Sequence, residues 1–192
     1  MVDIASQFRD HVTVIEGTID LVADIELAGQ RMSECLKAGG KILWMGNGGS
    51  AAEAQHLSGE LTGRFVRKRK GLASVALTAD TNALTAIAND FGYDKVFARQ
   101  IEGLCRPEDV VVGISTSGNS QNILEAVQVA RQIGAFVIGM TGNKGGEMRQ
   151  SCDLCLCIPS DDTQRIQEAH LLIGHALCDW IDEATAPLNN NE

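Results

Sequence analysis

The sequence lacks the long apolar stretches that membrane proteins carry. None of its hydrophobic runs approaches the ~18 residues that a spanning helix needs. The N-terminal residues also lack the basic-then-apolar order of a secretory signal peptide, so we expect a cytoplasmic protein without membrane contact. Positive charge is scarce, and the formal net charge of −9 argues against a protein that binds nucleic acid through its phosphates.

Aromatic residues make up only 4% of the chain, whereas small aliphatic side chains abound, as in proteins whose helices pack on a parallel sheet. Repeats, low-complexity segments and linkers are missing. A length of 192 residues suits one domain with a substantial core. We therefore expect a single domain over residues 1–192, with Asn189 to Glu192 as an unpacked tail.

Cysteine is more plentiful, with six residues, three of which form a Cys-x2-Cys-x-Cys cluster at Cys152, Cys155 and Cys157. The same segment matches a buried strand in which cysteine serves as a small hydrophobic residue. Because no second Cys or His pair lies at zinc-finger spacing, we favour packing over a metal site. Free thiols in a reducing compartment fit this pattern.

Apolar residues recur at steps of three or four near the N-terminus, which predicts helices with one apolar stripe. The stripe consists of Ile4, Phe8, Val12, Ile15, Ile19, Val22 and Ile25. It covers either the sheet or another subunit.

From Lys41 onward, short apolar runs alternate with segments of helical periodicity. The runs predict five strands, at residues 42–45, 73–77, 110–114, 136–140 and 154–158. Helices are predicted at 50–61, around 83–87, and at 121–132 and 162–183. This alternation indicates an α/β fold with a doubly wound, mostly parallel sheet and helices on both faces. Ligands bind such sheets beyond the carboxyl ends of the strands.

Two loops are expected at that end of the sheet. Four hydroxyl side chains crowd the loop after the third strand, at Ser115, Thr116, Ser117 and Ser120. Hydroxyls, a tight turn at Gly118 and the positive end of a helix together favour phosphate binding. The alternative is an ordinary serine-rich helix cap.

The other loop, Gly46 to Ser50, is rich in glycine. With Ala51 it satisfies the loose Gly-x-Gly-x-x-Ala fingerprint of dinucleotide sites, and Asp80 is expected to end the next strand. A nicotinamide-dependent enzyme is therefore an alternative. It would leave the hydroxyl-rich loop without a purpose.

Several ionisable side chains could perform chemistry. His56 and Glu60 are four residues apart and share a helix face, where they could bind a metal, supply a base or form a solvated pair. The last helix carries His170 and His175, each of which could also be a packed core residue. The basic run at residues 67–70 is expected to be a solvated loop, with a binding patch as the alternative.

Five segments in this order resemble the phosphoheptose isomerases of the sugar-isomerase (SIS) superfamily. They are residues 46–50, 56–64, 89–92, 113–120 and 165–168. The resemblance covers nearly the whole chain. It implies a flavodoxin-like fold, a homotetramer with active sites where subunits meet, and conversion of sedoheptulose 7-phosphate to an aldoheptose phosphate through an enediol.

The resemblance also assigns roles to single residues. It implies that Glu60 is the catalytic base and His175 the second acid–base group. One zinc ion per subunit is implied, with the ligands His56, Glu60, Gln167 and His175. The implied substrate contacts are Asn47, Gly48, Gly49, Asn89, Asp90, Ser115, Thr116, Ser117, Ser120 and Gln167.

The chain departs from some relatives at Gln164, where they carry an acidic residue implicated in activity. A non-catalytic SIS protein, which binds the bacterial replication initiator, resembles residues 83–90 but lacks equivalents of Glu60 and His175. A binding module is thus the alternative function.

The spacing of two implied zinc ligands adds a constraint. Gln167 and His175 are about 12 Å apart along a straight helix. A bend near Gly174, extended side chains or a neighbouring subunit must bring them to one ion.

Overall fold

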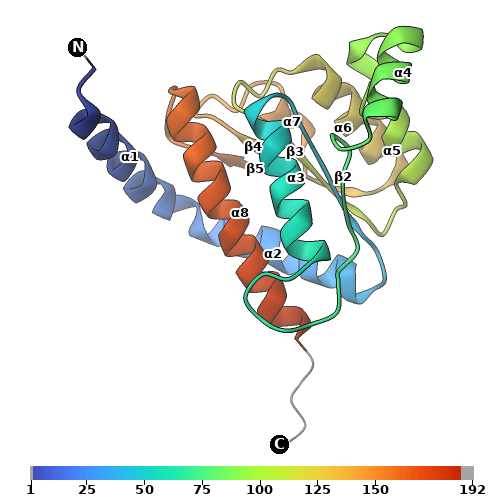
Figure 1. Ribbon diagram of the computed structural model, residues 1–192, viewed down its shortest axis with the longest axis horizontal. Helices are drawn as coiled ribbons and strands as arrows, with labels where there is room; N and C mark the ends of the chain where they lie inside the picture. Colours follow the sequence, from blue (N-terminus) through green and yellow to red (C-terminus); the bar gives the residue numbers. More distant parts are fainter. Residues whose placement is uncertain (1, 187–192) are drawn as a thin grey trace, which may run out of the picture.

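The structure is a computed structural model that describes residues 2–186. Five strands form one sheet in the order β2-β1-β3-β4-β5, and every neighbouring pair is parallel (Figure 1). The strands are β1 (Ile42–Gly46), β2 (Ser74–Ala76), β3 (Val110–Ser115), β4 (Phe136–Thr141) and β5 (Leu154–Cys157). The predicted doubly wound α/β fold is confirmed. The tail expected at Asn189 to Glu192 lies outside the described residues.

Helices cover both faces of this sheet. The helices on one face are α1 (Ile4–Thr18), α2 (Val22–Lys37), α3 (Gly49–Thr62) and α8 (Thr163–Thr185). The helices on the other face are α4 (Thr81–Phe91), α5 (Ala98–Leu104), α6 (Gln121–Ile133) and α7 (Met148–Ser151). Short 3-10 turns, η1 (Ile19–Leu21) and η2 (Tyr93–Lys95), complete the elements.

Alternating side chains of the central strands supply both hydrophobic cores. Trp44 and Val112 point into the core beneath α2, α3 and α8. Leu43 and Val111 point into the core beneath α5 and α6. Each of these strands is buried on both faces, which explains why it reads as a continuous apolar run rather than an alternating pattern.

The sequence-based prediction differs from the structure mainly in short elements. It missed α5 and α7, whose 7 and 4 residues are too few to establish a helical period. The N-terminal stripe is interrupted by η1, so the second helix begins at Val22. Within residues 2–186, no helix has both the length and the hydrophobicity of a membrane-spanning segment.

Much of the N-terminal stripe is exposed in the single chain. The exposed fractions are 64% for Ile4, 70% for Phe8, 52% for Val12, 65% for Ile19 and 46% for Val22. Val14 and Ile15, by contrast, pack against the core. The helix pair thus contacts the domain with one side and leaves an apolar side uncovered.

The strand order creates a topological switch between β1 and β3. From β1 the chain crosses to β2 at one edge, whereas β3 leads toward β4 and β5 at the other. The loops that follow β1 and β3 therefore leave adjacent strand ends and diverge to opposite faces. This is the position where doubly wound sheets bind ligands.

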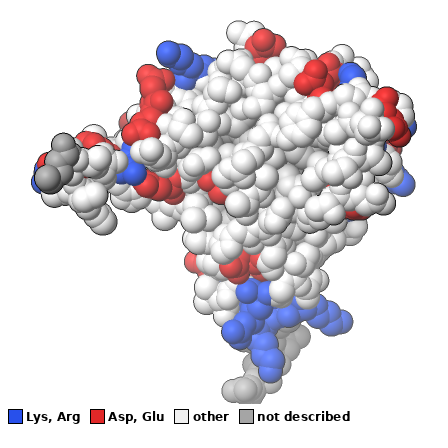
Figure 2. Space-filling model, turned by 45° about the horizontal axis from the view of Figure 1, so that its top comes forward, with Lys and Arg blue, Asp and Glu red and all other residues white. Residues whose placement is uncertain are grey.

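The basic segment between α3 and β2 is anchored to α8. Lys and Arg side chains gather at this end of the molecule (Figure 2). Arg69 is nevertheless buried: its guanidinium bonds the Asp182 carboxylate, and the two side chains are 2% and 0% exposed. Asp182 also accepts hydrogen bonds from the backbone N–H groups of Val66 and Arg67, at 2.9 and 2.8 Å. The prediction of a solvated loop was therefore wrong for Arg69, because a carboxylate on a distant helix compensates its charge.

Burial opposes ionisation of Asp182, but these hydrogen bonds outweigh it and lower the pKa of its carboxyl group. We expect Asp182→Asn to lower the free energy of unfolding by about 3–5 kcal/mol, because Arg69 would remain buried without its counter-ion. The stabilisation by Asp182 is present above its unfolded-state pKa and disappears as pH falls through the lowered folded-state pKa. Urea unfolding at pH 7 measures the effect.

Asp179→Asn is the matched control, since Asp179 pairs with Arg67 at 2.9 Å but is 55% exposed. Loss of an exposed pair should cost at most about 1 kcal/mol. Equal destabilisation by the two variants would contradict a special role for the buried pair.

Candidate active site

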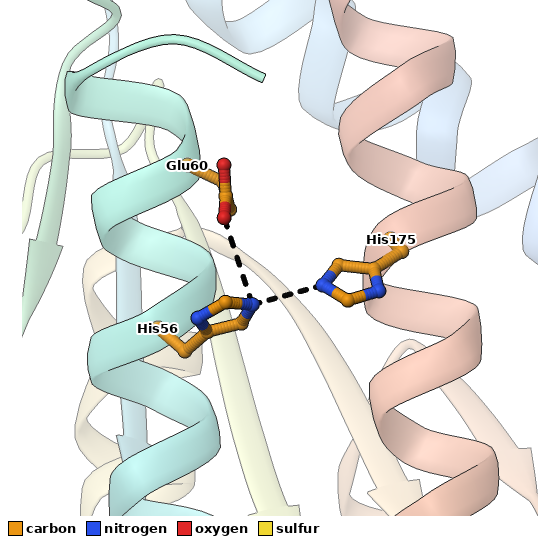
Figure 3. A group of neighbouring side chains, drawn as sticks. All are labelled: His56, Glu60 and His175. Carbon is orange, nitrogen blue, oxygen red and sulfur yellow. Dashed lines mark hydrogen bonds and ion pairs between the residues drawn. The ribbon is translucent and has the colours of Figure 1, made fainter. Parts of the chain in front are cut away.

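Three ionisable side chains from two helices converge at one point. His56 and Glu60 lie on α3 and His175 on α8 (Figure 3). His56 Nε2 is 2.8 Å from His175 Nε2 and 3.6 Å from Glu60 Oε1. Among residues 2–186, this is the only group of three or more His, Cys, Asp or Glu side chains whose ligand atoms all lie within 4.8 Å of one another. The structure thus joins His175 to the pair that sequence spacing had placed on one helix face.

Close packing of α3 on α8 creates this convergence. A Cβ atom at Gly174 would lie 2.5 Å from Leu57 Cδ1, so any larger residue would force the buried Leu57 side chain to shift. Gly49, at the start of α3, similarly contacts the side-chain amide of Gln167. Contacts thus run from the first turn of α3 to its centre, and the two helices pass one another in the same direction.

The three side chains are accessible to a ligand. His56 is 46% exposed and Glu60 is 25% exposed. Phe65 stacks on the His175 ring, with centroids 5.6 Å apart and an interplanar angle of 27°. Phe65 was not predicted as a site residue, although an aromatic side chain five residues after Glu60 could have indicated that it lies near this group. This aromatic ring limits how the imidazole can turn.

The side chains of the hydroxyl-rich loop contact one another. Ser120 occupies the N-cap position of α6, yet its side chain makes no capping hydrogen bond. Instead its Oγ lies 2.9 Å from Ser115 Oγ, which is also 3.4 Å from Ser117 Oγ. Gly118 takes a φ of +67°, and a Cβ there would collide with the backbone of Gly145. Ser120 is therefore the N-cap residue of α6, but its hydroxyl faces Ser115 instead of capping the helix.

Paired amides tie the first loop to the first turn of α6, which directly follows the second loop. Asn47 Nδ2 donates to Asn122 Oδ1 at 2.9 Å, and Asn122 Nδ2 donates to Asn47 Oδ1 at 2.8 Å. Tyr93 Oη also donates to Asn47 Oδ1, at 3.0 Å. Neither Asn122 nor Tyr93 was identified from the sequence, because their partner lies far away along the chain. These bonds hold both loops at the switch point.

The remaining predicted contacts surround this end of the sheet. Asn89 and Asp90 are exposed near the end of α4, and Asn89 Nδ2 donates to Asp90 Oδ1 at 2.8 Å. Tyr93, shortly after them, reaches Asn47. Thr116 follows directly after β3, and its carbonyl accepts from the Gly142 N–H at 3.0 Å.

The two groups of predicted residues are well separated within one chain. Glu60 lies eleven residues along α3 from Gly49, about 16 Å at the rise of an α-helix. Gln167 is on the Gly49 side of this gap. Its role as a ligand beside His56 and His175 stays a prediction.

Two alternative interpretations lose support. Asp80 does not end β2, which stops at Ala76; instead Asp80 caps α4 by accepting from the Ala83 N–H at 3.0 Å. Asp80 therefore lies four residues beyond the end of β2 and caps a helix, whereas the dinucleotide fingerprint expects an acidic residue at the end of that strand. Cys155 and Cys157 have their Sγ atoms 3.7 Å apart on β5. Within residues 2–186, however, Cys152, Cys155 and Cys157 do not bring three Sγ atoms within 4.8 Å of one another.

Comparison with known proteins identifies the family of this chain. The family model described as SIS domain matches residues 7–142. The phosphoheptose isomerase of Helicobacter hepaticus is 52% identical over 179 residues, which span 93% of this chain and 91% of that protein.

Two solved structures are similar over nearly the whole chain. The phosphoheptose isomerase of Neisseria gonorrhoeae is 46% identical, with a TM-score of 0.89 and coverage of 94% of this chain and 97% of that one. The phosphoheptose isomerase of Francisella tularensis is 38% identical, with a TM-score of 0.91 and coverage of 94% and 96%. The chain therefore belongs to the phosphoheptose isomerase family of SIS-domain proteins.

Proposed function

We propose that this chain isomerises sedoheptulose 7-phosphate to D-glycero-D-manno-heptose 7-phosphate, for bacterial heptose biosynthesis. The observation that carries the proposal is the meeting of a carboxylate from α3 with an imidazole from α8 beside a second histidine. Relatives with about 50% sequence identity bear the name of this isomerase. Their names therefore favour an enzyme over a non-catalytic binding module.

The reaction moves one proton between neighbouring carbons. A base removes the proton at C1 of the ketose, a cis-enediol forms, and the proton returns at C2. We assign this transfer to Glu60. Its Oε1 atom faces His56 at 3.6 Å, which leaves Oε2 for the substrate.

A second group must move the proton between the oxygens O1 and O2. We assign this step to His175, because imidazole can donate and accept protons near neutral pH. Phe65 stacks on the His175 ring and His56 contacts its Nε2 atom, so the orientation of the imidazole is restricted. Such orientation lets one ring exchange protons with both oxygens in turn.

The donor atoms fit a divalent metal. A hydrogen bond between the Nε2 atoms of His56 and His175 requires one unprotonated ring nitrogen, the form that binds metal. Two imidazoles and a carboxylate are a set that zinc prefers. We propose that His56, Glu60 and His175 hold one zinc ion per subunit, with Gln167 as a fourth ligand. When bound, zinc polarises the carbonyl oxygen of the substrate.

We assign the phosphate to the loop at Ser115–Ser120. Its hydroxyls and the N-terminal backbone of α6 can donate to phosphate oxygens, and the helix dipole adds attraction. Asn47, Gly48 and Gly49 contact the sugar from the other loop, and Asn89 and Asp90 contact it from α4.

The separation within one chain supports a shared site. An extended heptose phosphate spans about 10 Å between C1 and phosphorus at ordinary bond lengths, less than the length of α3 that separates Gly49 from Glu60. We therefore propose that the phosphate loop of one subunit faces the Glu60 group of a neighbour in a homotetramer. The same arrangement would bring Gln167 of a neighbouring copy to the zinc ligands. The exposed stripe on α1 offers apolar surface for this packing.

We expect Glu60→Gln to lower kcat by about 10²–10⁴-fold, because the amide keeps the shape of the side chain but cannot accept a proton. His175→Gln should act in the same way. Substrate binding, measured by calorimetry, should survive both changes. Near-normal turnover of Glu60→Gln would exclude Glu60 as the base.

Purified protein should contain about one zinc per chain by elemental analysis, and chelation should abolish activity. His56→Ala should reduce the zinc content, because it removes one of the proposed ligands. Cys155→Ser is the control for the cysteine cluster and should retain its zinc. A zinc content that followed Cys155 instead would place the metal on β5.

Hybrid tetramers test the shared site. The double variant Thr116→Val, Ser120→Ala should raise KM strongly, since it removes phosphate contacts made throughout the reaction. Mixing it with Glu60→Gln subunits, followed by refolding together, should restore up to about a quarter of wild-type activity, because some sites then combine two intact halves. No recovery in verified hybrids would show that each chain carries a complete site.

A further inference from the structure

A buried polar pair lies between α3 and α8, one turn from the proposed active site. His170 Nδ1 is 3.8 Å from Glu53 Oε2, and the two side chains are only 1% and 11% exposed. Neither of these atoms has a hydrogen-bond partner among the described residues. The two atoms are beyond hydrogen-bond length at 3.8 Å. Leaving both buried and unsatisfied is costly, and a proton donated from one atom to the other would satisfy both.

The backbone decides which nitrogen of His170 carries a proton. His170 Nε2 lies 3.2 Å from the carbonyl oxygen of Thr141, at the end of β4. A carbonyl oxygen can only accept, so Nε2 must donate. In the neutral ring Nδ1 is then an acceptor, and it requires a donor from Glu53. Only the protonated carboxyl group provides one.

Burial favours the same protonation states. It raises the pKa of Glu53 to about 7, although a hydrogen bond with Ser50 acts in the opposite direction. Burial likewise lowers the pKa of His170 to about 4, against the effect of its bond to Thr141. The alternative, an imidazolium facing a carboxylate, would remove two charges from water with few other partners.

We propose that Glu53 and His170 are positioning residues that form a neutral pair, in which the protonated Glu53 carboxyl donates to His170 Nδ1 once their 3.8 Å separation closes by about 1 Å to hydrogen-bond length. This bond sets the position of α3 against α8 and β4. The pair lies between the Gly49–Gln167 contact and the Leu57–Gly174 contact. Each of those two contacts includes a glycine, so neither joins two polar side chains. The catalytic consequence rests on the proposed function, because His56 and His175 follow on the same two helices.

The protonation state can be measured without an activity assay. The chain has only four histidines, so ¹⁵N spectra of the intact, histidine-labelled protein can be assigned with single variants. We expect His170 to remain neutral, with its proton on Nε2, from pH 5.5 to 7. A protonated His170, or a proton on Nδ1 alone, anywhere in this range would overturn the proposal.

Two substitutions of Glu53 distinguish its role as a hydrogen-bond donor from a role that needs its negative charge. Glu53→Gln keeps a neutral donor of similar shape, and we expect kcat within about threefold of wild type. Glu53→Leu removes the donor at similar size, and we expect kcat to fall more than tenfold while KM changes less than threefold, because the phosphate loop is untouched. Gln55→Leu is the control on the same helix, since it removes a 3.0 Å bond to the Thr78 carbonyl that does not involve α8.

Each outcome decides the matter. If folded Glu53→Gln loses as much activity as Glu53→Leu, the charge of Glu53 is needed and the neutral bond is wrong. If Glu53→Leu keeps full kcat, the pair does not position the site. Should Glu53→Leu fail to fold, the Gln variant and the ¹⁵N spectra decide alone. A wrong substrate assignment would leave the wild type inactive on the heptose phosphate but would not alter those spectra.

Discussion

The packing of α3 against α8 is the contact on which the proposed chemistry of this molecule depends. α3 contributes His56 and Glu60 to the converging group and α8 contributes His175. Only the close approach of the two helices brings His175 within 2.8 Å of His56. Gly174 allows that approach because the Leu57 side chain occupies the position where a Cβ atom would lie. The hydrophobic core below fixes the helices on the sheet, and the buried Asp182–Arg69 pair fixes the segment that leaves α3. Fold stability and site geometry are therefore coupled through the same two helices.

The position of the loops at the carboxyl ends of β1 and β3 depends on a different constraint, the strand order of the sheet. Parallel strands expose their loops at one edge, and the change of direction between β1 and β3 separates two of those loops. The reciprocal Asn47–Asn122 bonds then join what the topology separates. The hydroxyls of Ser115 and Ser120 face each other in the absence of a capping role. The loops are thus held in place by their own contacts, which would reduce the ordering cost of the substrate binding that we propose for them.

Local sequence patterns predicted the fold well because burial on both faces imposes continuous apolar runs on β1 and β3. They also located the hydroxyl loop and the His56–Glu60 spacing, since both are short-range features. Long-range pairings were beyond them: Asn122 with Asn47, Asp182 with Arg69 and Phe65 with His175 are separated by 75 or more residues. Nothing in the spacing of α8 distinguishes His170, which is buried, from His175, which is accessible. That difference depends on which side of α8 meets the sheet.

The distance along α3 between the glycine-rich loop and Glu60 has a genetic consequence. If each site takes its phosphate loop from one subunit and its proton-transfer groups from another, every chain serves two sites in two different roles. A chain with a defect in both roles would then inactivate two sites in any tetramer that it joins. Such an allele would act as dominant over a normal copy, whereas an allele that merely fails to fold would be recessive.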